Sequence, residues 1–122
     1  MKNSVVHIVI PVHGRLNYTK KCIESIKSQT YSNCKIYVVD DGSKDDTLSW
    51  LSSNKGISVI KGDGQLWWTG AVAKGCKYVL SVAHKDDYLM TLNNDVVLDN
   101  KAIELLVFAS TDNNSICGSL SV

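Results

Sequence analysis

The sequence predicts a three-layer α/β/α domain with a mostly parallel sheet, and three observations support this fold class. Short apolar runs alternate with segments of helical periodicity along the 122 residues. The apolar runs are nearly continuous, which is typical of strands buried on both faces of a parallel sheet. No repeat, low-complexity tract or linker divides the chain, so we expect a single domain. Alternating strands and helices of this kind form βαβ units with right-handed crossovers.

The first half of the chain carries three predicted strands and two predicted helices. Asn17 can act as the N-cap of the first helix, and Asp45 or Asp46 as that of the second. Gly56 gives the second helix a C-terminal glycine signal. The expected elements are a strand at Val5–Val12, a helix at 18–29, a strand at Lys35–Val39, a helix ending near Asn54 and a strand at Ile57–Lys61.

The second half begins with a glycine-rich loop, Gly62–Gly70, which contains two adjacent tryptophans. Apolar residues at helical spacing follow this loop, and a further apolar run begins after Asp86-Asp87. The expected elements are a helix near Ala71–Ala83, a strand at Tyr88–Leu92, a helix from Asp99 or Asn100 to about Ala109, and a last short strand at Ser115–Leu120.

Bulk composition excludes several classes of protein. The net charge of +1 provides no overall attraction to nucleic acid or to an acidic membrane. The four cysteines form no C-x-x-C pair, so we expect reduced thiols rather than a zinc or redox site. No stretch approaches the roughly 20 apolar residues of a spanning helix, and no signal peptide is evident. We therefore expect a cytoplasmic protein, with peripheral association with the inner face of the membrane left open.

Polar clusters follow three of the predicted strands. They are Asp40–Ser43, Gly62–Gly64 and Asn93–Asp95. Because ligands of open α/β sheets bind outside the carboxyl ends of the strands, we expect these clusters to meet at one site. Carboxylates there suit ribose hydroxyls, base N–H groups and a hard divalent metal. Each cluster alone is also compatible with an ordinary turn. Trp67 interrupts the G-x-G-x-x-G pattern, which argues against a nicotinamide or flavin enzyme.

The roles of several other side chains can be interpreted in two ways. Trp67 and Trp68 can form a wall for a sugar or base, or pack in the core or on a neighbouring chain. Lys74, near a helix N-terminus, can face diphosphate oxygens or remain solvated. His13 ends its strand and is placed to touch a ligand, whereas His7 lies mid-strand and suits a hydrogen-bonded core position.

Taken together, the motifs resemble the nucleotide-binding half of a family 2 inverting glycosyltransferase. The resemblance extends from about Val5 to Leu120 and rests on Val9–Arg15, Ser28–Tyr31, Val38–Asp45 and Asn93–Asp95. It implies a GT-A fold that uses a nucleotide-diphosphate sugar and a divalent metal, Mn or Mg. The Gly62–Gly70 segment resembles the rhamnosyltransferase-like branch, which implies a dTDP- or UDP-sugar, a saccharide or lipid-linked acceptor and a role in polysaccharide biosynthesis.

The resemblance also implies roles for individual residues. Asp41 would contact the base or ribose, Asp63 would approach the base, and Asn94 would face the ribose. Asp95 would bind the metal at the position of the family's D-x-D motif. The remaining substrate-binding candidates are Pro11, Val12 and His13, which would line the nucleotide pocket, Trp68, and Gly70 with Lys74 near the ribose and diphosphate.

Two departures from the family pattern stand out. Asn93 replaces the first acidic residue of D-x-D, which leaves one strong metal ligand instead of two. The chain also stops at Val122, before the acceptor-binding half, and no residue matches the family's general base. We therefore expect a donor-binding domain with an unidentified catalytic base. The alternative is a catalytically inactive fragment that self-associates through exposed apolar surface.

Overall fold

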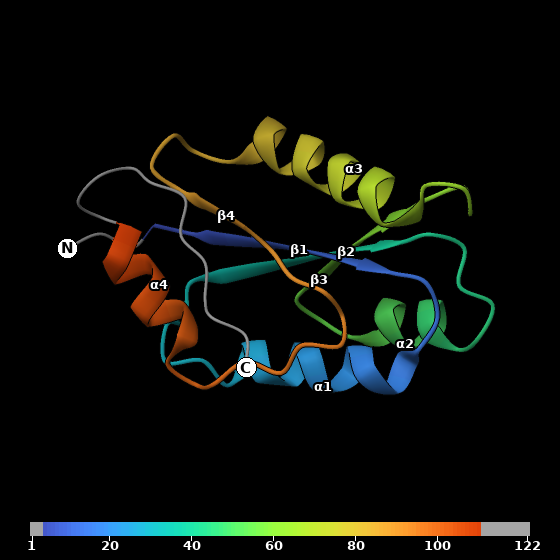
Figure 1. Ribbon diagram of the computed structural model, residues 1–122, viewed down its shortest axis with the longest axis horizontal. Helices are drawn as coiled ribbons and strands as arrows, with labels where there is room; N and C mark the ends of the chain where they lie inside the picture. Colours follow the sequence, from blue (N-terminus) through green and yellow to red (C-terminus); the bar gives the residue numbers. More distant parts are fainter. Residues whose placement is uncertain (1–3, 111–122) are drawn as a thin grey trace.

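The computed structural model describes residues 4–110, which form one four-stranded sheet flanked by helices (Figure 1). The strand order is β3-β2-β1-β4, and every neighbouring pair is parallel. The predicted fold class is therefore confirmed. The elements are β1 Val6–Val12, α1 Leu16–Lys27, β2 Cys34–Asp40, α2 Thr47–Ser53, β3 Ile57–Lys61, α3 Trp67–Val82, β4 Tyr88–Thr91 and α4 Ala102–Ser110.

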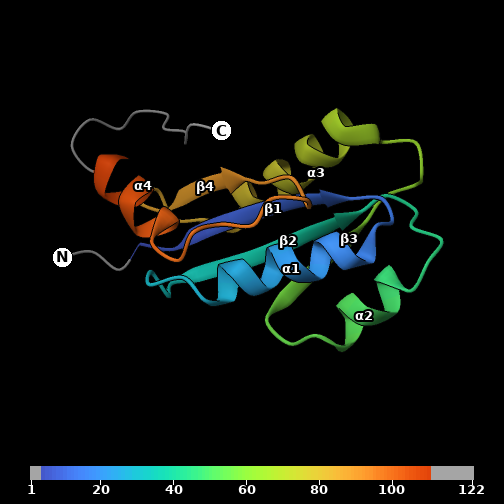
Figure 2. The same ribbon diagram turned by 60° about the horizontal axis from the view of Figure 1, so that its bottom comes forward.

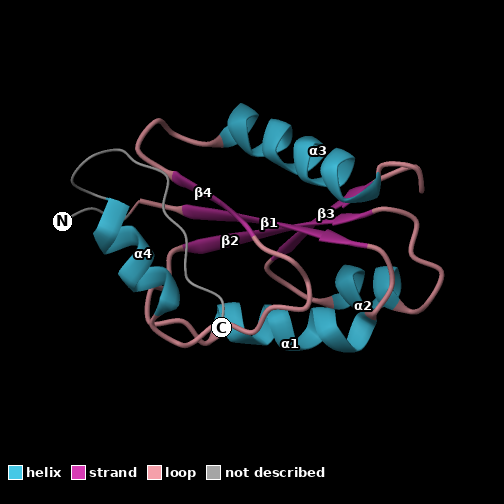
Figure 3. Ribbon diagram, in the orientation of Figure 1, coloured by secondary structure: helices cyan, strands magenta, loops and turns pink. Residues whose placement is uncertain are grey.

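The sheet separates two hydrophobic clusters. Figure 2 shows α1 and α2 on one face and α3 on the other, and the strand and helix layers are distinguished in Figure 3. Because side chains of a strand alternate between faces, Ile8 and Ile10 of β1 pack toward α1, α2 and α4, whereas Val9 packs toward α3. All seven residues of β1 are buried. The central strand thus holds the two outer layers in place.

The sequence prediction differs from the structure mainly at α3. This helix begins at Trp67, four residues before the predicted start at Ala71. The cause is a contact distant in sequence: the Asp41 carboxylate accepts the main-chain N–H groups of Leu66 and Trp67. The chain has no periodic signal for such a start. The strand predicted at Ser115–Leu120 lies outside the described residues.

A buried polar cluster closes the end of the sheet where β1 and β4 begin. His7 Nε2 donates to Asp87 Oδ2 at 2.8 Å, and its Nδ1 lies 2.8 Å from the Tyr37 hydroxyl. Asp87 also accepts the main-chain N–H groups of Val5 and His84. His7 is therefore a hydrogen-bonded core histidine, as predicted. Asp87 precedes β4, so it lies far from the carboxyl ends of the strands.

Two further sequence expectations concern thiols and membranes. Cys22, Cys34 and Cys76 are free thiols, as predicted, and Cys117 lies outside the described residues. Burial raises the pKa of Cys22 to about 12, with an added contribution from the nearby Asp95 charge. Among residues 4–110, no helix is both long enough and apolar enough to span a bilayer.

The Asp87 cluster predicts a pH dependence of stability. Burial favours the neutral acid, but the hydrogen bonds from His7, His84 and Val5 outweigh it and lower the pKa of Asp87. A carboxyl with a lowered pKa stabilises the fold above its ordinary titration range and loses that contribution as the pH falls through its folded value. The stability gap between wild type and Asp87→Asn should therefore be widest near pH 7 and shrink below about pH 4. Urea unfolding of both proteins across this pH range measures the difference in their free energies of unfolding. Asp86→Asn, at an exposed neighbour, is the matched control, and a gap independent of pH would contradict the assignment.

Candidate functional site

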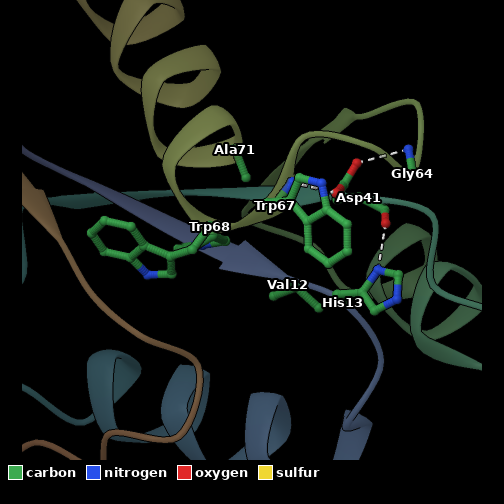
Figure 4. Close-up of a pocket in the computed structure, with 8 residues that line it drawn as sticks. Val12, His13, Asp41, Gly64, Trp67, Trp68 and Ala71 are labelled. Atoms are coloured by element: carbon green, nitrogen blue, oxygen red, sulfur yellow. Dashed lines mark hydrogen bonds between the residues drawn. The ribbon is translucent and has the colours of Figure 1, made fainter.

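A cavity of about 270 Å³ opens at the carboxyl edge of the sheet, between the end of β1 and the start of α3 (Figure 4). This is the edge at which open α/β sheets bind ligands. The lining combines residues that are remote in the chain, from the end of β1, from the loops after β1, β2 and β3, and from α3. They are Pro11, Val12, His13, Asp41, Gly64, Trp67, Trp68 and Ala71.

Asp41 connects the loops that surround this cavity. It is only 4% exposed, and its carboxylate accepts three main-chain N–H groups. Gly64 donates to Oδ1 at 2.8 Å, and Leu66 and Trp67 donate to Oδ2 at 3.0 Å each. The main chain of Asp41 also binds the loop after β1, since its N–H donates to the Val12 carbonyl and its carbonyl accepts from His13 Nδ1.

The surroundings of Asp41 keep it ionised. Burial of the carboxyl opposes ionisation, but the N–H groups of Gly64, Trp67 and Leu66 outweigh it, with a smaller contribution from His13, and lower the pKa of Asp41. The loop also fits tightly around the carboxylate. A Cβ atom at Gly62 would lie 2.6 Å from Asp41 Oδ1, so the main chain can approach this closely only because that residue is glycine. The ionised Asp41 carboxylate at the base of the cavity therefore helps to hold the folded loop together.

The residue before it, Asp40, shapes the neighbouring turn. Its buried carboxylate accepts both the main-chain N–H and the hydroxyl of Ser43. The Ser43 hydroxyl oxygen in turn accepts the Gly14 N–H at 2.7 Å. This chain of hydrogen bonds fastens the loop after β1 to the loop after β2. Two residues of the Asp40–Ser43 cluster thus support the site without lining it.

Of two strained non-glycine residues in the described part of the chain, one lines the cavity. Within residues 4–110, the non-glycine residues with positive φ are Arg15 and Trp67, each at φ 58°. Both stand at the N-terminus of a helix, α1 and α3 respectively. Such a conformation costs about 1–3 kcal/mol and persists where surrounding contacts enforce it, most often at functional sites. Trp67 is also 76% exposed, so burial of its ring does not explain its position.

The Asn93–Asp95 cluster borders the cavity through Trp68. The indole Nε1 of Trp68 donates to Asn93 Oδ1 at 2.7 Å. Asn94 Nδ2 donates to Thr19 Oγ1 of α1 at 3.1 Å, which fixes the middle residue of the cluster. Asp95 is exposed at the end of the cluster. Since both amides have protein partners, Asp95 offers the exposed carboxylate of this cluster.

The structure brings five predicted site residues to the cavity and leaves the others outside its lining. Those at the cavity are Pro11, Val12, His13, Asp41 and Trp68. Asp63 is exposed on the glycine-rich loop and accepts the Gln65 N–H. Gly70 and the exposed Lys74 lie on α3, and Asn94 and Asp95 follow β4. Because the strands are parallel, their carboxyl ends lie at the same end of the sheet, and Asp41, Asp63 and Asp95 each follow one of these ends.

Three residues that line the cavity are not among the binding residues predicted from the resemblance: Gly64, Trp67 and Ala71. Gly64 belongs to a cluster that the sequence does single out, and Trp67 adjoins Trp68, so both carried a signal. Ala71 had none, because a small helical residue beside a glycine-rich loop looks like ordinary packing.

The described residues fit a metal only in a limited way. Within residues 4–110, no three His, Cys, Asp or Glu side chains gather closely enough to hold one ion. Magnesium and manganese are often bound through one or two carboxylates together with phosphate oxygens and waters of a ligand. Asp95 can supply one such carboxylate, so the donor set fits a metal shared with a bound diphosphate.

Sequence comparisons connect this chain with glycosyltransferases. The model of the family "Glycosyl transferase family 2" matches residues 7–121. Glycosyltransferase GlyG of Streptococcus pneumoniae is 27% identical over 108 residues, covering 85% of this chain and 34% of that protein. Chondroitin synthase of Pasteurella multocida is 28% identical over 105 residues, covering 83% of this chain and 10% of that protein.

Solved structures agree with this fold. S. aureus TarS has a TM-score of 0.72 at 16% identity, covering 89% of this chain and 33% of that one. The mannosyltransferase PcManGT of Pyrobaculum calidifontis, in complex with GDP-Man and Mn²⁺, has a TM-score of 0.75 at 14% identity, covering 88% and 32%. The chain thus spans about a third of the length of GlyG and of each of these structures. Since the family model covers nearly all of it, this chain belongs to glycosyl transferase family 2.

Proposed function

We propose that this domain binds a nucleotide-diphosphate sugar in the cavity beside α3 and serves as the donor half of an inverting glycosyltransferase. The observation that carries the proposal is the cavity itself: it lies at the carboxyl edge of a parallel sheet and is walled by exposed indoles and by the Pro11–His13 segment. A base or sugar ring suits such a mixed aromatic and polar wall. The PcManGT complex with GDP-Man supports the same ligand class.

The donor would extend from the cavity along the edge of the sheet. The base would lie between the Pro11–His13 segment and the indoles, with Asp63 near it on the loop. The ribose and diphosphate would extend toward Gly70 and Lys74 on α3 and toward Asn94 after β4. Because α3 begins at Trp67, Lys74 lies about two turns into the helix, and its positive charge rather than the helix N-terminus would attract phosphate oxygens.

Asp95 would hold a divalent metal, Mn or Mg, together with the diphosphate of the donor. When bound, such a metal offsets the negative charge of the leaving diphosphate. Inverting transfer further needs a general base that deprotonates the acceptor hydroxyl, and we assign that role to no residue of this chain. The glycine-rich loop with its tryptophan pair favours a deoxy-sugar donor such as dTDP-rhamnose, through its resemblance to rhamnosyltransferase-like enzymes.

Replacing Asp95 tests the metal assignment. Calorimetric titration with UDP and dTDP, with and without Mn²⁺, should show binding to wild type that strengthens with the metal. Asp95→Ala should remove at least about 1.4 kcal/mol of this metal-dependent binding, a factor of ten in Kd. Asp86→Ala, an exposed carboxylate at the other end of the sheet, should behave like wild type. Metal-dependent binding retained in Asp95→Ala would show that another residue binds the ion.

Restoring the missing acid should have the opposite effect. In Asn93→Asp, a second carboxylate stands two residues before Asp95, and we expect the Kd for Mn²⁺ to fall by about tenfold or more, since carboxylates are preferred ligands of this ion. Free Mn²⁺ measured by electron paramagnetic resonance gives the affinity. Asn93→Ala, which loses the Trp68 contact without adding charge, separates the two effects. An equal affinity in Asn93→Asp and Asn93→Ala would argue against this geometry.

Self-association is the second candidate function, and exposed apolar side chains favour it. Leu80, Leu105 and Phe108 are 73%, 60% and 77% exposed. Large exposed apolar area promotes contacts between chains. If the protein self-associates, the apparent mass from sedimentation velocity should rise with protein concentration. Leu105→Ser should abolish this rise, whereas Lys101→Ser, the control at another exposed position, should leave it unchanged. A monomer at all concentrations would exclude this function.

A further inference from the structure

Most of the hydrogen-bonding capacity of the Asp41 carboxylate is used within the protein. A carboxylate has about four acceptor positions, and three main-chain N–H groups of the glycine-rich loop and the start of α3 occupy Asp41. These donors lie 23 to 26 residues further along the chain. The group therefore joins β2 to the segment that carries the tryptophans.

The last of these donors belongs to Trp67, whose conformation needs an external restraint. A bulky residue at φ 58° is strained, and glycine would be favoured there. The 76% exposed indole gains little from packing within the protein. In Figure 4 the Trp67 ring extends from the Asp41 side toward Val12 and His13. The hydrogen bond from the Trp67 N–H to Asp41 is thus a contact that fixes the strained residue directly.

We propose that Asp41 is a positioning residue that holds the Trp67 indole as a stacking wall for the nucleobase of the donor. The inference deepens the proposed function and rests on it. Asp41 shapes the wall through its bonds to the loop, and the base is recognised by the face of the Trp67 ring. Stacking on an indole tolerates every base, because each has a π-face, whereas hydrogen bonding to a carboxylate discriminates among bases.

The two roles of Asp41 give different patterns across nucleotides. In UDP and dTDP the base N3 carries a hydrogen that a carboxylate can accept, whereas N3 of the cytosine in CDP is itself an acceptor, which a carboxylate disfavours, and the only donor of this base is its N4 amino group. If Asp41 contacts the base directly, replacing Asp41 weakens the binding of UDP and dTDP much more than the binding of CDP. If Asp41 instead positions Trp67, the replacement weakens the binding of all three nucleotides by a similar factor. The environment of Trp67 then also changes in the nucleotide-free protein.

Asp41→Asn removes the charge and turns one oxygen into a donor that faces main-chain N–H groups. We expect calorimetry to show at least tenfold weaker binding of UDP, dTDP and CDP alike, with the three factors agreeing within about threefold. In a Trp50→Phe, Trp68→Phe background, Trp67 fluorescence should also show altered acrylamide quenching in the nucleotide-free protein. Asp46→Asn is the matched control, because Asp46 is exposed and makes no side-chain cap at α2.

Trp67→Gly keeps the experiment decisive if Asp41→Asn does not fold. Glycine adopts positive φ readily, so this variant removes the indole and relieves the backbone. We expect an unchanged or higher unfolding midpoint and at least tenfold weaker binding of all three nucleotides. Wild-type affinity in Trp67→Gly, or a loss in Asp41→Asn confined to UDP and dTDP, overturns the inference. If wild type binds no nucleotide at millimolar concentration, the proposed function and the stacking role fail together, and unchanged Trp67 quenching in Asp41→Asn would then refute the positioning role separately.

Discussion

The candidate site depends on one buried anion, the carboxylate of Asp41. Its side chain binds the N–H groups of Gly64, Leu66 and Trp67, and its main chain binds the loop after β1. Buried main-chain donors without partners are destabilising, so the carboxylate satisfies groups that the loop cannot satisfy itself. The glycine-rich loop, the start of α3 and the cavity wall therefore all take their positions from this residue.

The sheet provides the rigid frame in which that anion operates. Val12 and Asp40 are register partners, so β1 and β2 end at the same level and their loops leave the sheet side by side. β1 is packed on both faces, and its other end is tied to the start of β4 through His7 and Asp87. A frame fixed at both ends can sustain the backbone strain at Trp67, in the cavity wall, and at Arg15, two residues after His13.

The sequence predicted the sheet more fully than the site. Continuous apolar runs mark β1 and β2 because the sheet buries them on both faces, and shorter apolar runs mark β3 and β4, which lie at the sides of the sheet and are only partly buried. The polar clusters that follow the strands mark the binding edge. The early start of α3, the positive φ of Trp67 and the bond from Trp68 to Asn93 left no local signal. Each depends on residues about 25 positions apart, and side-chain pairing at that separation is decided by the tertiary fold.

Two acids at the same sheet edge illustrate why residue type alone does not assign a role. Asp41 and Asp95 both follow a strand of the sheet, β2 and β4 respectively, and both suit a ligand-binding carboxylate. Asp41 is 4% exposed and surrounded by main-chain donors, whereas Asp95 is exposed beyond two amides that already have partners. A carboxylate that already accepts three N–H groups holds the protein around it in place, and one that faces solvent has more acceptor positions left for a ligand. The division between shaping and binding at this edge therefore follows from hydrogen-bond supply rather than from the order of acids in the chain.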